Sequence, residues 1–189
     1  MDAALARSPR TPKSEAGRLL CRTARVFAPT GQGHLDRARA DAQELRAECV
    51  ARGERWARSY TDCQLAVIAL LQERAAAASR HARSMLRGKR SIGDRNGLAL
   101  GLDLLAAALA AQGAIEQAAA ARAAAEVLWS AVGQPERGIP DARHMQARYE
   151  RAAHAVPGEE RHEELMARSV AIGSEGVLQD LLGPVREVN

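Results

Sequence analysis

The side chains best suited to acid–base chemistry lie near the C-terminal end of the chain. His144, His154 and His162 fall in adjacent predicted helices, close to four glutamates at positions 159, 160, 163 and 164. One His and one Glu within reach of each other could act as general base and acid. A metal site needs three or four converging ligands, and no two of these histidines stand four residues apart on one helix. The pattern fits polar helix surfaces better, so we predict no catalytic residue, no metal site and no cofactor.

The three cysteines, Cys21, Cys49 and Cys63, are odd in number and lack C-x-x-C spacing. A disulfide framework or a zinc site is therefore not expected, and free thiols in a reducing compartment are the natural interpretation. No His or Lys lies near Cys63 in the sequence to lower its pKa, which argues against a nucleophilic role.

A basic stripe is the third chemical feature. Arg80, Arg83 and Arg87 stand at i, i+3 and i+7, so they share one helix face and form a candidate anion-binding site. A solvated outer face is the competing interpretation. The net charge of +4 comes almost entirely from arginine, and aromatic residues make up only 3% of the chain, too few for base stacking. The nearest approach to a phosphate loop, Gly88-Lys89-Arg90, lacks the upstream glycine and the hydroxyl. We expect no direct binding of nucleic acid.

The elements that position these residues follow an internal repeat of 40 residues. Gln32, Gln72 and Gln112 align at this spacing, and so do three alanines, at 38, 78 and 118. Each Gln begins a predicted turn between two helices, and each Ala lies a few residues into the next helix. A small side chain there allows close approach of paired helices. The spacing predicts a helical repeat.

No segment shows the alternation of a strand, so the predicted fold is all-α: a tetratricopeptide-like solenoid of antiparallel helix pairs with eight or nine helices. In the first unit Ser14 is expected to open a helix that Pro29 ends, and Gly88 is expected to end a later one. The domain plan is a disordered lead-in at 1–13 and a single domain at 14–189, divided into units 14–52, 53–92 and 93–133 and C-terminal capping helices at 139–183, one of them at 141–155.

No apolar run reaches the roughly 18 residues of a membrane span, and residues 1–13 lack the apolar core of a signal peptide. A cytoplasmic location with no membrane contact is expected.

The first helix of each pair should line the concave side of such a solenoid. The predicted groove is apolar with one acid, and would suit an amphipathic helix of a protein partner or a hydrophobic small molecule. The C-terminal helices, or a second copy in a homodimer, are the competing occupants. Its predicted lining is Tyr60, Cys63, Val67, Leu70, Leu100, Asp103 and Ala107.

The second half of the chain resembles the C-terminal helical-repeat region of actinobacterial LuxR-type and AfsR-type ATPase transcription regulators. The resemblance is carried by Gly93-Asp94-Arg95, Ala111-Gln112-Gly113, the run from Ala124 to Trp129, and Val132-Gly133-Gln134-Pro135. It implies a signalling lineage. The chain lacks the GxxxxGK[ST] motif of the ATPase domain, and with the sequence ending at Asn189 we expect no helix-turn-helix domain.

From these features we predict a non-catalytic helical-repeat binding module, for protein interaction or ligand sensing, related to transcriptional regulators. The alternative is a small helical enzyme or a small-molecule-binding accessory protein of a biosynthetic pathway, built on the same scaffold. A deep pocket holding His144 or Asp103 beside Tyr60 would favour the alternative.

Overall fold

The computed structural model describes residues 12–133 and 159–183, which form seven helices and contain no strand. The all-α prediction is therefore confirmed over these residues. Residues 1–11 of the predicted lead-in at 1–13 and the predicted helix at 141–155, with His144 and His154, lie outside them. The helices are α1 (Pro12–Gly31), α2 (Leu35–Ala51), α3 (Arg55–Leu71), α4 (Ala75–Ser91), α5 (Arg95–Ala110), α6 (Ile115–Val132) and α8 (Glu159–Leu182).

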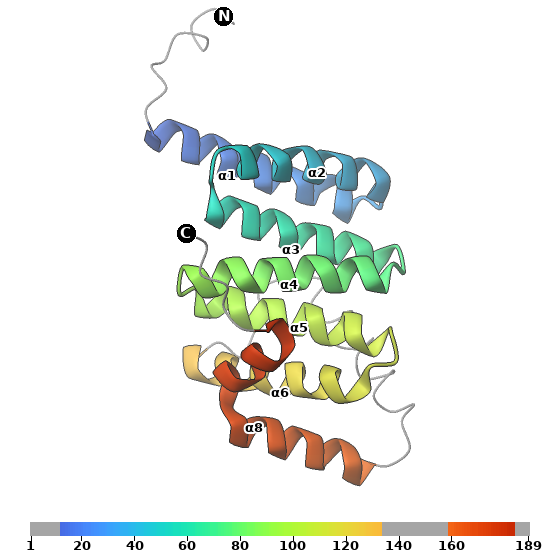
Figure 1. Cartoon of the computed structure of the whole chain (residues 1–189). Coiled ribbons are helices and arrows are strands. Elements are labelled where there is room, and N and C mark those ends of the chain that lie inside the picture. The colour runs from blue at the N-terminus through green and yellow to red at the C-terminus, as the bar shows by residue number, and fades with distance from the viewer. Residues whose placement is uncertain (1–11, 134–158, 184–189) are drawn as a thin grey trace, which may run out of the picture.

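The helices run back and forth, each packed on the next (Figure 1). α6 is followed in space by α8, and α3 also contacts α1 and α5. Helices α2, α3, α4 and α5 begin at positions 35, 55, 75 and 95, so the helix starts are 20 residues apart. The residue two before each start has a positive φ; it is Glu73 before α4 and glycine before the other three. Twice this spacing equals the interval seen in the sequence.

Two boundaries differ from the sequence prediction. α1 begins at Pro12 rather than Ser14, and it continues through Pro29 to Gly31. Pro29 has no N–H to donate to the carbonyl of Arg25, but the helix continues for two more residues. The carbonyls of Ala28 and Pro29 then accept hydrogen bonds from Gln32 and His34 in the following turn. α4 does not stop at Gly88 but runs to Ser91. A Cβ on Gly88 would overlap Ser59 Oγ, so this glycine allows α3 and α4 to approach closely instead of ending a helix.

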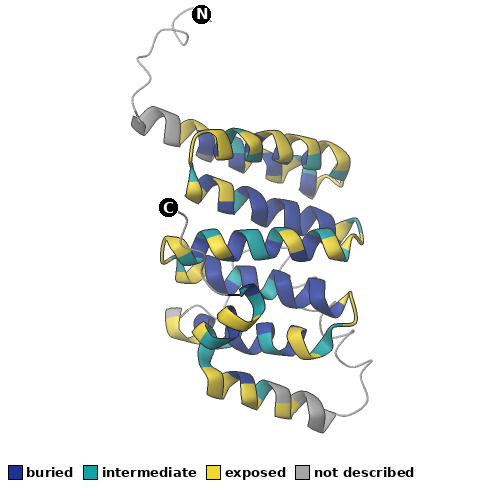
Figure 2. Ribbon diagram, in the orientation of Figure 1, coloured by how far each residue is buried: buried dark blue, intermediate teal, exposed yellow. Residues whose placement is uncertain are grey.

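Burial follows the order of the helices. Ala38, Ala78 and Ala118 are fully buried, as the small side chains at helix crossings were expected to be. Every residue from 61 to 70 in α3 is buried, because this helix has neighbours on both sides (Figure 2). One apolar cluster joins α3 to α6 with the end of α8, and a second joins α1, α2 and α3.

The aligned glutamines link neighbouring turns. Gln72 Nε2 donates to Asp36 Oδ1 at 3.0 Å, and Gln112 Nε2 donates to the carbonyl of Ala75 at 3.3 Å. Each glutamine therefore connects the end of an odd-numbered helix to the start of the even-numbered helix before it.

Candidate functional site

The seven residues of the predicted groove do not share one open surface. Cys63, Val67, Leu70 and Ala107 are buried in the apolar cluster of α3 to α6. Tyr60 and Leu100 are partly exposed, and the side chain of Asp103 is nearly buried. The four buried side chains are covered by neighbouring helices, so in this structure they contribute packing rather than a contact surface.

Asp103 is held by partners on α6. Its Oδ1 accepts a hydrogen bond from Arg122 Nη1 at 2.7 Å, and its Oδ2 accepts one from Trp129 Nε1 at 2.8 Å. Less than a tenth of the side chains of Asp103 and Arg122 is exposed. The Arg122 side chain therefore ties α6 to α5.

Tyr60 contacts a buried lysine. The side chain of Lys89 is 0% exposed; its Nζ lies 3.9 Å from the Tyr60 ring centroid and 5.4 Å from that of Trp56. The same Nζ donates to Asp94 Oδ2 at 2.7 Å. Burial tends to raise the pKa of the Asp94 carboxyl, but the hydrogen bonds from Lys89 and the Gly97 amide lower it below its ordinary value. This cation joins α3, α4 and α5.

Two arginines of the predicted anion-binding stripe bind the end of α8. Arg83 Nε donates to the carbonyl of Leu181 at 3.3 Å, and Arg87 Nη2 donates to that of Leu182 at 3.2 Å. The last carbonyls of a helix have no intrahelical donor and carry the negative end of its dipole. Arg80, the third member, is exposed. The stripe therefore contacts a partial negative charge within its own chain.

The helix end that these arginines bind belongs to residues 174–182, here called the C-terminal segment. Gly173, with φ 78° and ψ 161°, breaks α8 just before it, so the segment turns back over α6 (Figure 1). This backbone region is essentially restricted to glycine. Val177 and Leu178 are 2% and 1% exposed, and Leu182 is also buried. Glu175, on the outer side, pairs with Arg90 of α4.

A second polar cluster, which the sequence analysis did not identify, surrounds Asp62 where α2, α3 and α4 meet. Its Oδ1 accepts from Arg46 Nε at 2.7 Å and lies 3.3 Å from His81 Nδ1, and its Oδ2 accepts from Ser84 Oγ at 2.7 Å. The side chain of Asp62 is 1% exposed. Burial alone would raise the pKa of this carboxyl, but the hydrogen bonds from His81, Ser84 and Arg46 bring it below its ordinary value.

Comparing positions 40 residues apart in the sequence could have revealed this cluster. Forty positions later, the residues corresponding to Arg46, Asp62, His81 and Ser84 are all apolar and buried. They are Leu86, Leu102, Ala121 and Ala124. The Asp62 cluster thus places polar and charged side chains at positions whose equivalents 40 residues later are buried apolar residues.

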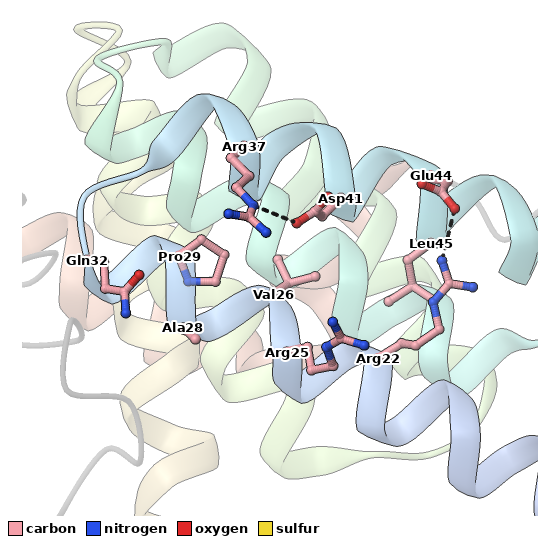
Figure 3. A pocket seen from close by; sticks show the side chains of 10 residues that line it. All are labelled: Arg22, Arg25, Val26, Ala28, Pro29, Gln32, Arg37, Asp41, Glu44 and Leu45. Carbon is pink, nitrogen blue, oxygen red and sulfur yellow. Dashed lines mark hydrogen bonds and ion pairs between the residues drawn. The ribbon is translucent and has the colours of Figure 1, made fainter. Parts of the chain in front are cut away.

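An open cleft between α1 and α2 has a volume of about 450 Å³. Val26 and Leu45 are buried at its base, and charged side chains surround them (Figure 3). Arg22 pairs across it with Glu44 and Glu48, whereas Arg37 pairs with Asp41 along α2. This cleft is far in sequence from the predicted groove and contains none of its residues.

The thiols differ in reactivity. Burial raises the pKa of Cys63 to about 12 and also raises that of Cys49, whereas Cys21 is exposed. We therefore predict that iodoacetamide at pH 8 modifies Cys21 alone in the folded chain, because only the thiolate reacts. Mass spectrometry of peptides would check this, with the chain in urea as the control in which all three thiols react. Rapid native alkylation of Cys63 would contradict the prediction.

Comparison with protein-family models, curated proteins and solved structures finds no match for this chain. Within residues 12–133 and 159–183, no group of three or more His, Cys, Asp or Glu side chains is arranged to hold a metal ion. Over the same residues, each helix is too short or too polar to cross a bilayer.

Proposed function

We infer that this chain is a non-catalytic, tetratricopeptide-like helical-repeat module that binds a short amphipathic helix of a protein partner, and that it is related to the helical-repeat regions of ATPase transcription regulators. The regular helix starts and the contacts between successive odd-numbered helices support the repeat. The observation that supports this function best is that the C-terminal segment packs against α4 and α6 in the way a bound helical ligand would.

Three contacts define what this face recognises. Val177, Leu178 and Leu182 supply an apolar stripe that is buried in the cluster of α3 to α6. Arg83 and Arg87 bind the carbonyl end of the segment, and Arg90 pairs with the acidic residue near its start. Apolar anchors give affinity, while charged contacts fix the direction of a helix in a groove. The preferred ligand is therefore an amphipathic helix with an acidic start and an accessible C-terminal end.

The test uses a labelled peptide of residues 172–183 and the full chain. Leu178→Asp buries a charge in place of an apolar anchor, so it should release the segment and empty the face. We expect fluorescence anisotropy to show the peptide binding at least tenfold more tightly to this variant than to the wild type. Hydrogen exchange of residues 174–182 would report the release independently.

Two controls accompany the test. A peptide with the same Leu178→Asp change should not bind, and adding Arg83→Glu and Arg87→Glu to the variant chain should weaken binding of the unchanged peptide. If exchange shows the segment released and the peptide still does not bind, the proposed function is wrong.

The α1–α2 cleft favours a second candidate function, the binding of a small anionic molecule. Its volume falls in the range of small-ligand sites, and its buried floor is apolar. Three of its lining residues are arginines and two are acids. A ligand of this class would raise the melting temperature of the wild type but not of an Arg25→Ala variant.

A further inference from the structure

The break at Gly173 allows α8 two conformations, a bent form and a straight form. In this structure residues 159–172 and 174–182 form two helical parts that meet at the glycine. If Gly173 adopted helical angles, the 24 residues of α8 would form one rod about 36 Å long. The segment would then project about 13 Å beyond position 173, away from its own α4.

Two glycines hold the bent form. Gly173 occupies backbone angles that other residues avoid, and a Cβ on Gly176 would overlap Ile172 Cγ2. Glycine is also a poor residue inside a helix, which works against the straight form. Both glycines therefore favour the bent form, and replacing Gly173 is the change that shifts the equilibrium toward the straight form.

The residues beside the hinge are unusually apolar for a surface. Val170 and Ile172 are 54% and 46% exposed, whereas the anchors a few positions later are buried. The polar contacts of the segment lie at its rim, between α4 arginines and either helix carbonyls or Glu175. Detachment breaks no covalent or fully buried ionic contact, and it leaves an apolar hinge region available for a second molecule.

We propose that the partner helix bound by this face is the C-terminal segment of a second copy of the chain, so that two copies exchange residues 174–182 about Gly173. The proposal rests on the helix-binding function above. The segment of a second copy makes the same contacts as the segment in cis, since it has the same sequence. Exchange of an identical element is a low-cost route to a dimer. Val170 and Ile172, which are exposed in the single chain, stand within three positions of the hinge about which the copies exchange.

Cysteine pairs distinguish the two arrangements in the full chain. Arg90→Cys is placed in one copy and Glu175→Cys in another, both with Cys21→Ser to remove the exposed thiol. The two copies are mixed at high concentration, warmed to allow exchange, and treated with a short dimaleimide. A 90–175 link between chains, identified by mass spectrometry at twice the chain mass, is expected only if the segment crosses over.

The chain carrying both cysteines is the control, because it can link within one copy. A link there, with none between copies in the mixture, would overturn the exchange and leave the helix-binding function standing. No link in either experiment would overturn both, since the segment would then not lie on α4.

A hinge variant provides a second measurement. Gly173→Ala strains the bent form and favours the straight helix, so the dimer association constant should rise at least tenfold in size-exclusion chromatography with light scattering. Gly183→Ala, at a positive φ after the end of the helix, is the matched control and should not change it. A Gly173→Ala chain that stays monomeric at the highest concentration would contradict the proposal.

Discussion

Replacing Asp62 with alanine is expected to lower the free energy of unfolding by about 3 kcal/mol, because it leaves a partly buried Arg46 without its carboxylate. His81 and Ser84 lose their shared acceptor in the same change. Urea denaturation followed by circular dichroism would measure the loss. Arg58→Ala is the control; its guanidinium is nearly half exposed and 3.9 Å from Asp62, so its effect should stay below about 0.5 kcal/mol.

Removing one member of the Asp62 cluster and replacing the whole cluster by apolar residues should change the free energy of unfolding differently, and the repeat shows which residues to use for the replacement. A variant carrying Arg46→Leu, Asp62→Leu, His81→Ala and Ser84→Ala copies the residues found 40 positions later. Replacing a buried ionic group by well-packed apolar residues is often neutral or stabilising. We expect this variant to be at least as stable as the wild type. A loss as large as that of Asp62→Ala would mean that α2, α3 and α4 cannot pack around these four positions as α4, α5 and α6 pack around the equivalent positions 40 residues later.

The same cluster sets a pH dependence. The folded-state pKa of Asp62 lies below its ordinary value of 3.8, so the stability it contributes is complete above that value. This contribution is lost as the pH falls from 3.8 through the folded pKa. Asp94 acts in the same direction. The four-residue variant should therefore lose less stability than the wild type when the pH is lowered below 4.

Asp103→Ala is expected to destabilise the chain by about 3 kcal/mol, because the buried guanidinium of Arg122 and the Trp129 indole N–H both lose their acceptor. Trp129 lies beside the change, so tryptophan fluorescence in a Trp56→Phe background gives a local signal in urea and circular dichroism gives the global one. Glu126→Ala removes the other, half-exposed partner of Arg122 and should cost less than about 0.5 kcal/mol.

This substitution also decides between two roles for Asp103. The sequence predicted it as the single acid of a binding groove, whereas its contacts tie α5 to α6. In a double-mutant cycle with Arg122→Met, a structural tie gives a coupling energy of more than about 1 kcal/mol. If Asp103→Ala left the stability unchanged and, added to Leu178→Asp, abolished binding of the peptide of residues 172–183, the sequence prediction would be supported instead.

Local signals were enough to predict the helices and most of their ends. The all-α prediction follows from apolar residues at helical spacing. The 40-residue interval between the aligned glutamines is twice the observed spacing of the helix starts. Pro29 and Gly88 were misjudged because neither acts through local propensity alone. The turn after α1 supplies donors to its last carbonyls, and Gly88 is needed for contact with Ser59, a residue distant in sequence.

The candidate site was predicted from the sequence much less well than the helices were. Helical register places Cys63, Val67, Leu70 and Ala107 on one side of their helices, but whether that side is open depends on what packs against it. The arginine stripe was recognised as a site for negative charge, yet its occupant is a helix end almost 100 residues away in sequence.

The sequence by itself therefore determined the helices, their regular spacing and the small residues at their crossings, since these depend on neighbours within a few turns. Only the tertiary structure decided which charges are paired, which apolar faces are covered, and that residues 174–182 turn back onto α4 and α6. Those outcomes depend on contacts between distant segments, and periodicity carries no information about which segments will meet.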